Sequence, residues 1–529
     1  MFFFSEHHIL ATVLLTPLLG AIVLLFVPRE RADLLRKIGN VFGMLGLAVS
    51  LLLLWKFKSN SADAFQFVAD VNWIPSLGAH FTVGIDGLSS LMVTLATFLG
   101  ALAILSSWSA IRRNQKEYYI LLLLLQTCLL GIFMSLDFLL FYVFWEAMLV
   151  PVYFLIAMWG GENRLYVAIK FFLYALSGSI VMLLAILAIN HSRGTFDMRE
   201  ILLHPFTAQS AHLQNWLFWG FFFAFAIKVS MFPFHTWLPD ALAEAPTGVS
   251  VILAGVLLNT GTYGFLRFSV PMFPDATWKY RAAMIILSEI AVVYGALVCL
   301  TQKNMQRLIA YSTISQMGFC TLGIFLLTPL GLYGSVIQQI SHGLTTGALF
   351  LIVGILYERR RTPLISEFGG LGMSMPKFAA IYTIITLASL GMPLLSGFIG
   401  EFAILRGAFD VRWQLSAWSL LGVILIAGSL LWLYQRVMFG GLTNPANENL
   451  PDLNRRELAT LIPLVLLSIW IGVYPAPLFR VLKQPVERII NAVRPGYFPD
   501  ARVPAAPSAE LRPNPSSIPA PASSAPESQ

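Results

Sequence analysis

The stretch that decides the fold runs from Phe221 to Leu266 and reads FFFAFAIKVSMFPFHTWLPDALAEAPTGVSVILAGVLLNTGTYGFL. Lys228 lies about 12 residues into an apolar run that begins near Trp216, which is roughly 18 Å along a helix and close to the middle of a bilayer core of about 30 Å. A lysine at that depth costs on the order of 3 kcal/mol, so such a residue usually faces the protein interior and has a partner. Pro233 and Pro239 interrupt the helix soon afterwards. The sequence thus predicts an ionisable group beside a helix break inside the membrane.

The composition of the whole chain is that of a polytopic membrane protein. Of the 529 residues, 57% are hydrophobic and only 12% are charged, whereas a typical soluble domain carries about 25% charged residues. The net charge of +7 does not indicate a nucleic-acid partner, because the basic residues sit in short loops between apolar runs. The expected surroundings are therefore a lipid bilayer.

No sequence pattern indicates a metal or a cofactor on this chain. Cys128, Cys299 and Cys320 lie in or beside apolar segments and form no CxxC pair, which argues against zinc and iron–sulfur ligation. There is no GxGxxG motif after a strand and no Walker A motif, so no nucleotide site is expected. The N-terminal MFFFSEHHIL lacks a basic segment, so the first apolar run is predicted to be a retained helix.

The apolar runs that are long enough to span a bilayer number about fourteen. Two of the boundaries between these runs are unusual. Met134 and Asp137 border a very tight turn between two spans. The run 377–409 would be about 50 Å long as one helix, and Gly391 and Pro393 offer a place for it to break. The expected fold class is an all-α polytopic membrane protein with spans at 9–27, 38–55, 83–107, 118–134, 137–159, 166–190, 214–238, 246–268, 281–299, 305–327, 331–357, 377–409, 415–437 and 457–480.

Lysine and arginine gather in the loops that follow the odd-numbered helices. The positive-inside rule places those loops in the cytoplasm and both termini outside. The opposite loops, to which Arg267 is assigned, are sparser in basic residues. From about residue 501 the chain is rich in proline, alanine and serine, which predicts a disordered tail. The predicted divisions are N-terminal helices in 1–115, a first repeat in 116–270, a second repeat in 271–440, a C-terminal helix in 441–485 and a polar, largely disordered tail in 486–529.

Two broken helices indicate an internal repeat. The helix with Lys228 is interrupted by prolines, and five helices later the helix with Glu401 is interrupted by Gly391 and Pro393. Because five is an odd number, the two helices lie in opposite senses. Inverted repeats with a broken helix in each half are typical of transporters, whose binding site lies near the midplane of the membrane.

Several predicted helices carry one buried polar residue each. Glu146, Asn259 and His342 lie well inside predicted spans, and Glu401 lies in the second broken helix. Carboxylates, an amine and an imidazole can exchange protons if water bridges them. The chain therefore has groups that move protons and none that moves electrons. The candidate site residues are Glu146, Lys228, His235, Asn259, His342 and Glu401.

Each candidate also has a structural alternative. Glu146 and Lys228 can form a structural ion pair, and His342 can be a packed, hydrogen-bonded histidine. His235 lies beside two prolines, where a packing role is as reasonable as proton exchange. Asn259 is most simply a hydrogen bond between two helices.

Three further features are interpreted as structural. Trp237 and the other interfacial aromatic residues are predicted to anchor the protein at the membrane surface. The run Arg359–Arg361 is most simply a topology signal. Asp137 stands at the start of a helix, where the helix dipole favours a carboxylate, so it is interpreted as a cap.

Six segments of the chain carry a recognisable pattern: SLDFLLFYVFWEAMLVPVYFLIAMWGG, KVSMFPFHTWLPDALAEAPT, SVILAGVLLNTGTYGFLRF, QRLIAYSTISQMGF, SHGLTTGALFLIVGILYERR and GMPLLSGFIGEF. They resemble one known family, chain M of bacterial NADH-quinone oxidoreductase, which is the equivalent of mitochondrial subunit 4 in respiratory complex I. The similarity covers residues 80–440 closely and the rest loosely. Glu401 occupies the broken-helix position where the sister chains L and N usually carry lysine.

The resemblance implies a fourteen-helix subunit with two inverted five-helix repeats and no cofactor of its own. NADH, flavin, iron–sulfur clusters and quinone would belong to partner chains, and quinone reduction there would drive proton translocation here. The neighbours would be chains L and N and the small membrane chains, in a bacterial inner membrane. By motif match, Glu146 pairs with Lys228, and Glu401 lies nearest the outer exit. His235 and His342 match histidines of the polar axis.

Several positions depart from the pattern of that family. Asn259 stands where the family usually has lysine, and asparagine can hydrogen-bond a chain of waters but cannot hold a proton near pH 7. Ser230 replaces the proline of a KxP motif, and Leu242 replaces the histidine of PDAH. Gln316 replaces the histidine of SxSH, and Gln306 stands where lysine is common.

These departures leave two functions open. In the favoured one, the chain is a working proton-translocating subunit in which water or His342 replaces the missing lysine. In the other, it is a structural or regulatory paralogue that completes the membrane arm but translocates fewer protons or none. A subunit of a cation/proton antiporter or of a membrane hydrogenase shares the scaffold and ranks lower, because the segments around Glu146 and Glu401 look most like chain M.

Overall fold

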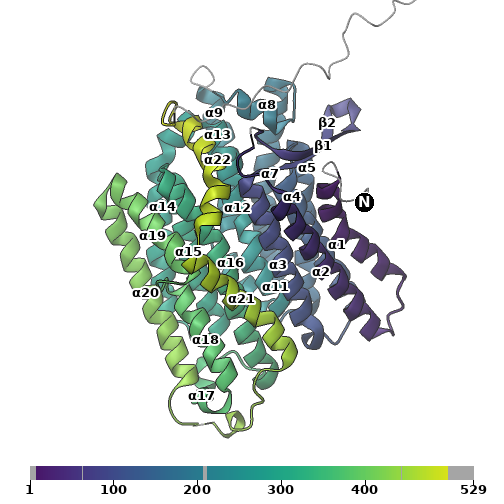
Figure 1. Ribbon diagram of the computed structural model, residues 1–529, viewed down its shortest axis with the longest axis vertical. Helices are drawn as coiled ribbons and strands as arrows, with labels where there is room; N and C mark the ends of the chain where they lie inside the picture. The colour runs from purple at the N-terminus through teal and green to yellow at the C-terminus, as the bar shows by residue number, and fades with distance from the viewer. Residues whose placement is uncertain (1–7, 62, 207–210, 443, 499–529) are drawn as a thin grey trace, which may run out of the picture.

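The computed structural model describes residues 8–61, 63–206, 211–442 and 444–498. It shows a bundle of long α-helices with one small β-hairpin at its end (Figure 1). This architecture agrees with the predicted class of an all-α polytopic membrane protein. The start of the chain and the part of the predicted tail (486–529) that follows residue 498 lie outside the described residues.

The helices follow one another with short connections. The first part of the chain contains α1 (Ile9–Phe26), α2 (Ala32–Lys56), β1 (Gln66–Ile74), β2 (Ala79–Ile85), α3 (Gly87–Ala110), α4 (Gln115–Met134), α5 (Phe138–Ala147), α6 (Leu149–Trp159), α7 (Arg164–Arg193) and α8 (Met198–Leu203). The middle part contains α9 (Ala211–Val229), α10 (Trp237–Glu244), α11 (Thr247–Ile252), α12 (Leu258–Gly264), α13 (Val270–Met272), α14 (Pro274–Leu300), α15 (Met305–Phe325) and α16 (Pro329–Arg360). The last part contains α17 (Leu371–Ser374), α18 (Pro376–Ser389), α19 (Ser396–Val411), α20 (Trp413–Met438), α21 (Arg455–Val473) and α22 (Ala476–Val493).

Twelve helices of the described part of the chain are long and apolar enough to cross a membrane. The interrupted segments α9–α10 and α18–α19 are not among these twelve, so the total of fourteen crossings and the inverted repeat stay predictions. Burial separates central helices from peripheral ones: the most apolar window is 100% buried in Thr247–Met272 and 94% buried in α16, but only 28% buried in α20. The polar residues of the central helices are therefore shielded from lipid.

The central helix Thr247–Met272 is continuous but irregular. It joins α11, α12 and α13 through two π-helical segments, η4 (Leu253–Leu257) and η5 (Phe265–Ser269). π-Helical turns are rare and occur frequently at functional sites. Asn259 lies in α12, between the two segments.

Both predicted helix breaks are present. α9 ends at Val229, and Ser230 then has a φ of +62°, so the chain leaves the helix before α10 begins. α18 ends at Ser389, and the connection to α19 contains Gly391 with a φ of +70°. Glycine tolerates this left-handed conformation without steric cost.

The β-hairpin was not predicted. β1 and β2 pair antiparallel, from Gln66 opposite Ile85 to Ile74 opposite Ala79, and the predicted span 83–107 therefore begins with strand residues. Apolar and polar residues alternate in short runs here, which a search for long apolar stretches does not detect. The hairpin packs on the tight turn before α5, where Asp137 accepts hydrogen bonds from the main chain of α5. The interpretation of Asp137 as a helix cap is thus confirmed.

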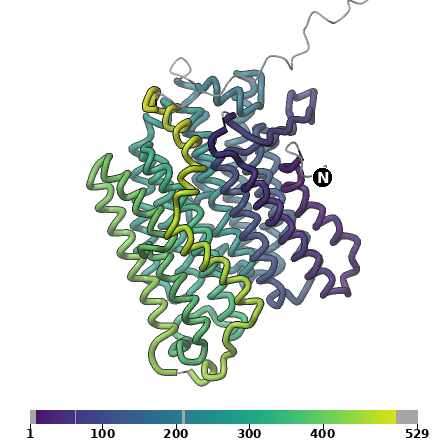
Figure 2. The backbone as a smooth tube through the Cα atoms, in the orientation of Figure 1, coloured from purple at the N-terminus to yellow at the C-terminus, as the bar shows by residue number. Residues whose placement is uncertain are grey.

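The C-terminal segment differs from the sequence expectation. The predicted span 457–480 is divided between α21 and α22, and α22 continues to Val493, into the segment 486–529 that was predicted to be largely disordered. The buried residues of α22 recur every three or four positions, as in an amphipathic helix, so no long apolar run announces it. Figures 1 and 2 show α21 and α22 crossing the front of the bundle, and both contact α16 and α3.

Candidate proton-transfer site

The first broken helix places Lys228 inside the protein. Lys228 is the residue before the end of α9, and its side chain is only 1% exposed. The indole N–H of Trp237 donates to the carbonyl oxygen of Ile227 at 2.9 Å, which helps to satisfy the carbonyls at the end of α9. Trp237 is itself buried. The prediction that Trp237 anchors the protein at the membrane surface is therefore wrong, because its polar atom is used inside the bundle.

Aromatic rings, and not a carboxylate, form the immediate surroundings of the Lys228 amine. Its Nζ lies 5.2 Å from the centre of the Trp145 ring and 5.6 Å from that of Phe171. Among the described residues, neither Lys228 Nζ nor Glu146 Oε1 has a hydrogen-bond partner. The direct ion pair expected between Glu146 and Lys228 is thus absent, although Glu146 is the charged group that acts on Lys228 electrostatically. A desolvated cation over aromatic faces is stabilised by about 2 kcal/mol.

A charged group missed by the sequence analysis lies beyond the break. Asp240, in α10, accepts from Lys170 Nζ at 2.7 Å and forms a salt bridge with Arg307 at 3.0 Å. Lys170 also donates to the main-chain oxygen of Thr236. His235 is buried beside this group, with its ring 5.0 Å from that of Tyr294, and its Nδ1 has no hydrogen-bond partner among the described residues. The structure therefore supports a packing contact for His235 and leaves one ring nitrogen unpaired.

Asn259 forms the hydrogen bond between helices that the sequence suggested. Its Nδ2 donates to the main-chain oxygen of Gly255 at 2.9 Å and to that of Gln339 at 3.3 Å. Its Oδ1 is buried and accepts no hydrogen bond from the part of the chain that the structure describes. The side chain of Gln339 in turn accepts from Thr262 at 2.8 Å. Asn259 thus ties the irregular central helix to α16.

His342 lies in the middle of α16 beside a small polar cavity. Its Nδ1 is 3.0 Å from the hydroxyl of Thr346, and its Nε2 is buried with no hydrogen-bond partner in the described ranges. The cavity has a volume of about 10 Å³, which is close to the minimum that holds one water molecule. Its polar lining includes Ser312, Gln316, Gln338, Ser341, His342 and Thr346.

Glu401 lies in α19, just after the second helix break. Its Oε1 accepts from Gln316 at 2.9 Å and from Gln338 at 3.4 Å, and Gln338 also donates to Gln316 at 2.7 Å. A Cβ atom on Gly391 would collide with the Glu401 carboxylate. The break in the helix therefore makes the space that this buried carboxylate occupies.

One face of α16 connects these groups. Gln338, Ser341, His342 and Thr345 are separated by three or four residues, so they share one side of the helix. We call this row the α16 ladder. Through Gln338 it reaches Glu401, through His342 it borders the polar cavity, and through the neighbouring Gln339 it meets Asn259. Within the described residues, the amine of Lys228 forms no hydrogen bond with the α16 ladder.

Other buried polar residues were also missed by the sequence analysis. Arg267, which was assigned to an outer loop, is buried in the central helix and forms a two-pronged salt bridge with Asp86, at 2.8 and 2.5 Å. Glu289 in α14 accepts from Ser419 at 2.7 Å. Arg267 and Glu289 are single charged residues inside apolar runs, which could have indicated that they are buried. The spacing of polar residues in QQISHGLTT could have indicated the α16 ladder.

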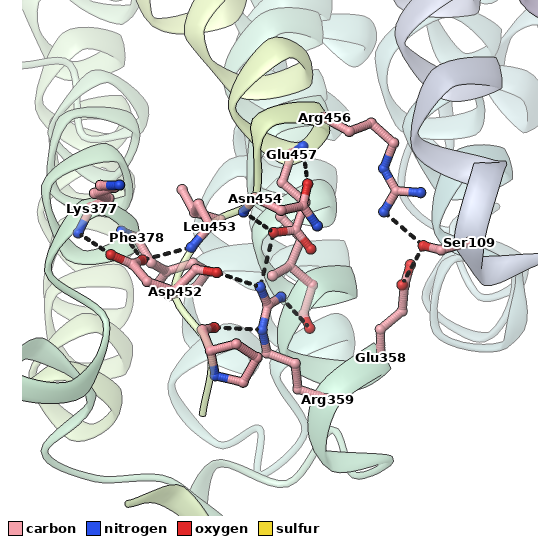
Figure 3. Close-up of polar contacts among 12 residues, drawn as sticks. Ser109, Glu358, Arg359, Lys377, Phe378, Asp452, Leu453, Asn454, Arg456 and Glu457 are labelled. Atoms are coloured by element: carbon pink, nitrogen blue, oxygen red, sulfur yellow. Dashed lines mark hydrogen bonds and ion pairs between the residues drawn. The ribbon is translucent and has the colours of Figure 1, made fainter. Parts of the chain in front are cut away.

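A separate network fixes the far end of the bundle, around α21 (Figure 3). Arg359 bonds to Glu457 at 2.9 Å, with both side chains largely buried. The hydroxyl of Ser109 donates to Glu358 and accepts from Arg456. Arg359 therefore does more than mark topology, because it joins α16 to the start of α21.

No group of three or more histidine, cysteine, aspartate or glutamate side chains within the described ranges is arranged to hold a metal ion. The three cysteines are buried and free. The polar residues of the site are instead titratable or hydrogen-bonding groups placed in series between helices.

These features define a class: polytopic helical membrane proteins of the antiporter type, with a buried lysine and a buried carboxylate at two helix breaks. The chain belongs to the NADH:quinone oxidoreductase/Mrp antiporter transmembrane family, whose sequence model matches residues 135–427.

Similar proteins cover nearly the whole chain. NADH-ubiquinone oxidoreductase chain 4 of Arabidopsis thaliana is 44% identical over 483 residues, which are 91% of this chain and 97% of that protein. NADH-quinone oxidoreductase subunit M of Rhodobacter capsulatus is 41% identical over 499 residues, which are 92% of this chain and 97% of that protein. A chain of the solved respiratory complex I from Thermus thermophilus with bound NADH has a TM-score of 0.83 and 32% identity, over 92% of this chain and 99% of that one.

Proposed function

We propose that this chain is the proton-translocating, antiporter-like subunit of the M (chain 4) type in the membrane arm of a NADH-quinone oxidoreductase. The names of its relatives, its membership of the family and the buried polar axis all support this function. NADH, flavin, iron–sulfur clusters and quinone are assigned to partner chains. Quinone reduction in those chains drives proton transfer in this one.

The observation that carries the proposal is the buried amine of Lys228 at the end of a broken helix. A lysine without a hydrogen-bond partner in a dry interior is unfavourable in its charged form. Its protonation therefore responds to nearby charge, of which the Glu146 carboxylate is the source. An amine in such a place can take up and release a proton when the charge around it changes.

The proposed route runs from Lys228 past Asn259 to the α16 ladder and ends at Glu401. Asn259 cannot hold a proton, so its role is to orient hydrogen bonds between the central helix and α16. His342, with its unpaired Nε2 beside the polar cavity, is the titratable group of the ladder. Glu401 is the terminal carboxylate. His235 and Glu146 also belong to the proposed site. They lie at the start of the proposed route, where the proton reaches Lys228.

The surroundings of the chain follow from the same family. We assign it to a bacterial inner membrane, between chains L and N and next to the small membrane chains. Both termini are placed on the outer side by the distribution of lysine and arginine. The start of α1 and the end of α2 lie at one end of the bundle. Gln484 in α22 donates a hydrogen bond to the main-chain oxygen of Ser61, just after α2. This contact supports a common side of the membrane for both termini.

Replacement of Lys228 by methionine tests the proposal. Methionine has a similar length but no charge, so Lys228→Met is expected to leave assembly of the complex intact and to lower the number of protons translocated per NADH oxidised. The measurement is proton uptake by vesicles that contain the purified complex. Lys37→Met, which changes an exposed lysine of α2, is the control. An unchanged proton-to-electron ratio in Lys228→Met would refute the proposed role.

A further inference from the structure

We propose that a pocket between α14, α16, α19 and α22 binds the phosphate headgroup of an anionic membrane phospholipid. The pocket has a volume of about 400 Å³, within the range of about 300–1,000 Å³ that is usual for small-molecule sites. None of its lining residues belongs to the proposed proton route. The lining includes Arg281, Thr328, Leu330, Asp410, Arg494 and Tyr497.

Two arginines give the pocket its charge. The guanidinium groups of Arg281 and Arg494 both lie 5.1 Å from the ring of Trp278. Arg412 is near enough for its charge to act on Arg281 together with that of Arg494. Like charges repel, so gathering three arginines is unfavourable unless an anion offsets them. Neither Arg281 nor Arg494 forms a salt bridge with a carboxylate of the described part of the chain.

The two arginines differ in how they are held. Arg281 donates to the carbonyl oxygens of Phe325 and Leu326, at 3.1 and 2.8 Å, which fixes its guanidinium at the end of α15. The Arg494 side chain donates no hydrogen bond to a described residue, and its Nε is buried without a partner. Arginine presents N–H groups in a fork that matches phosphate oxygens. Arg494 therefore has donors available for a phosphate, beside a cation that is already fixed.

One carboxylate, that of Asp410, also lines the pocket and contributes to its net charge. Asp410 would repel an anion, but it forms a salt bridge with Arg406 at 3.2 Å. The charge near the pocket thus remains positive when both residues are included. The first turn of α16, at Pro329, also borders the pocket, and the start of a helix favours negative charge.

The position of the pocket favours a lipid over a free phosphate ion. It lies where α16 begins, where α19 ends and beyond the end of α22. Trp278 and Tyr497 are about half exposed there, as in the aromatic belt at a membrane surface. Leu330 adds an exposed apolar side chain to the rim, against which an acyl chain can pack.

The test measures the lipid bound by the purified, lipid-depleted complex. Mixed micelles that contain phosphatidylglycerol or phosphatidylcholine with the same acyl chains are added, and the lipid retained is quantified by mass spectrometry. Arg494→Gln removes the charge without breaking a hydrogen bond within the described chain, and is expected to weaken phosphatidylglycerol binding about tenfold. The control, Arg436→Gln, changes an exposed arginine of α20 outside the pocket.

Two results of the lipid-binding comparison would overturn the proposal. One is equal retention of phosphatidylglycerol by Arg494→Gln and Arg436→Gln. The other is equal affinity for the two lipids. A third arm adds inorganic phosphate as competitor: persistence of the bound lipid supports a lipid site, and its displacement by phosphate would show a site for free anions instead. Arg494→Lys keeps the charge and is expected to retain partial binding, which separates loss of the site from loss of the fold.

Discussion

At the scale of single residues, Glu401 shows how the site departs from the family pattern without losing its connections. Gln316, which by the sequence resemblance stands where histidine is usual, donates directly to the Glu401 carboxylate. Gln338 of the α16 ladder approaches the same oxygen. A residue that cannot titrate therefore orients one that can, and the carboxylate remains joined to α16.

Glu401→Gln is expected to lower the proton-to-electron ratio of the complex while stability changes little. The amide oxygen of the new glutamine can still accept from Gln316 and Gln338, so the change in stability is on the order of 1 kcal/mol or less. The ratio is measured in vesicles, and stability is measured by thermal denaturation of the purified complex. Glu200→Gln, at an exposed carboxylate, serves as control. A normal ratio in Glu401→Gln would remove this residue from the route.

Single polar letters in apolar runs were sufficient to predict that Lys228, Asn259 and His342 are buried. Their partners were not predictable in the same way. Lys228 meets Trp145, and Glu401 meets Gln316, which lies 85 residues away in the sequence. Such contacts depend on how distant helices pack, and no local pattern encodes that. The structure has no direct salt bridge between Glu146 and Lys228, although the charge of Glu146 still acts on Lys228.

At the scale of elements, proline and glycine residues allowed the two helix breaks to be predicted. Elements whose apolar residues are spaced periodically, and not in runs, were missed. Both helix breaks lie beside residues that favour an interruption: Pro233 cannot donate a main-chain hydrogen bond, and Gly391 adopts a positive φ without steric cost. α22 and the hairpin were missed because their apolar residues are spaced at periods of 3.6 and 2 and do not form runs. The π-helical segments beside Asn259 have no sequence signal that we recognise.

Arg359→Met is expected to loosen the attachment of α21 to α16. The mutation leaves Glu457 largely buried without its cation, which costs on the order of 3 kcal/mol. The apparent melting temperature of the purified complex should therefore fall. Arg361→Met removes the same charge from an exposed neighbour and should leave it nearly unchanged. Equal shifts in the two variants would mean that the network in Figure 3 does not hold α21 in place.

At the scale of the whole molecule, composition alone predicts a helical membrane protein, and the resemblance in six segments predicts the family. The structure shows which helices hold the buried polar residues. Thr247–Met272 and α16, two of the most buried helices, carry Asn259 and the α16 ladder. Lys228 and Glu401 are buried at the helix breaks that end α9 and precede α19. We propose that proton transfer follows a route that begins near one helix break and ends at the other.

Infrared difference spectroscopy of the working complex tests this route most directly. Protonation of a buried carboxylate during turnover gives a carboxylic-acid carbonyl band, which is assigned to Glu401 if Glu401→Gln lacks it. If protons reach Glu401 by way of Lys228, the band should appear in the wild-type complex and should be lost or strongly reduced in Lys228→Met, while Lys37→Met retains it. A band of full amplitude in Lys228→Met would contradict the account, because Glu401 would then take its proton from elsewhere.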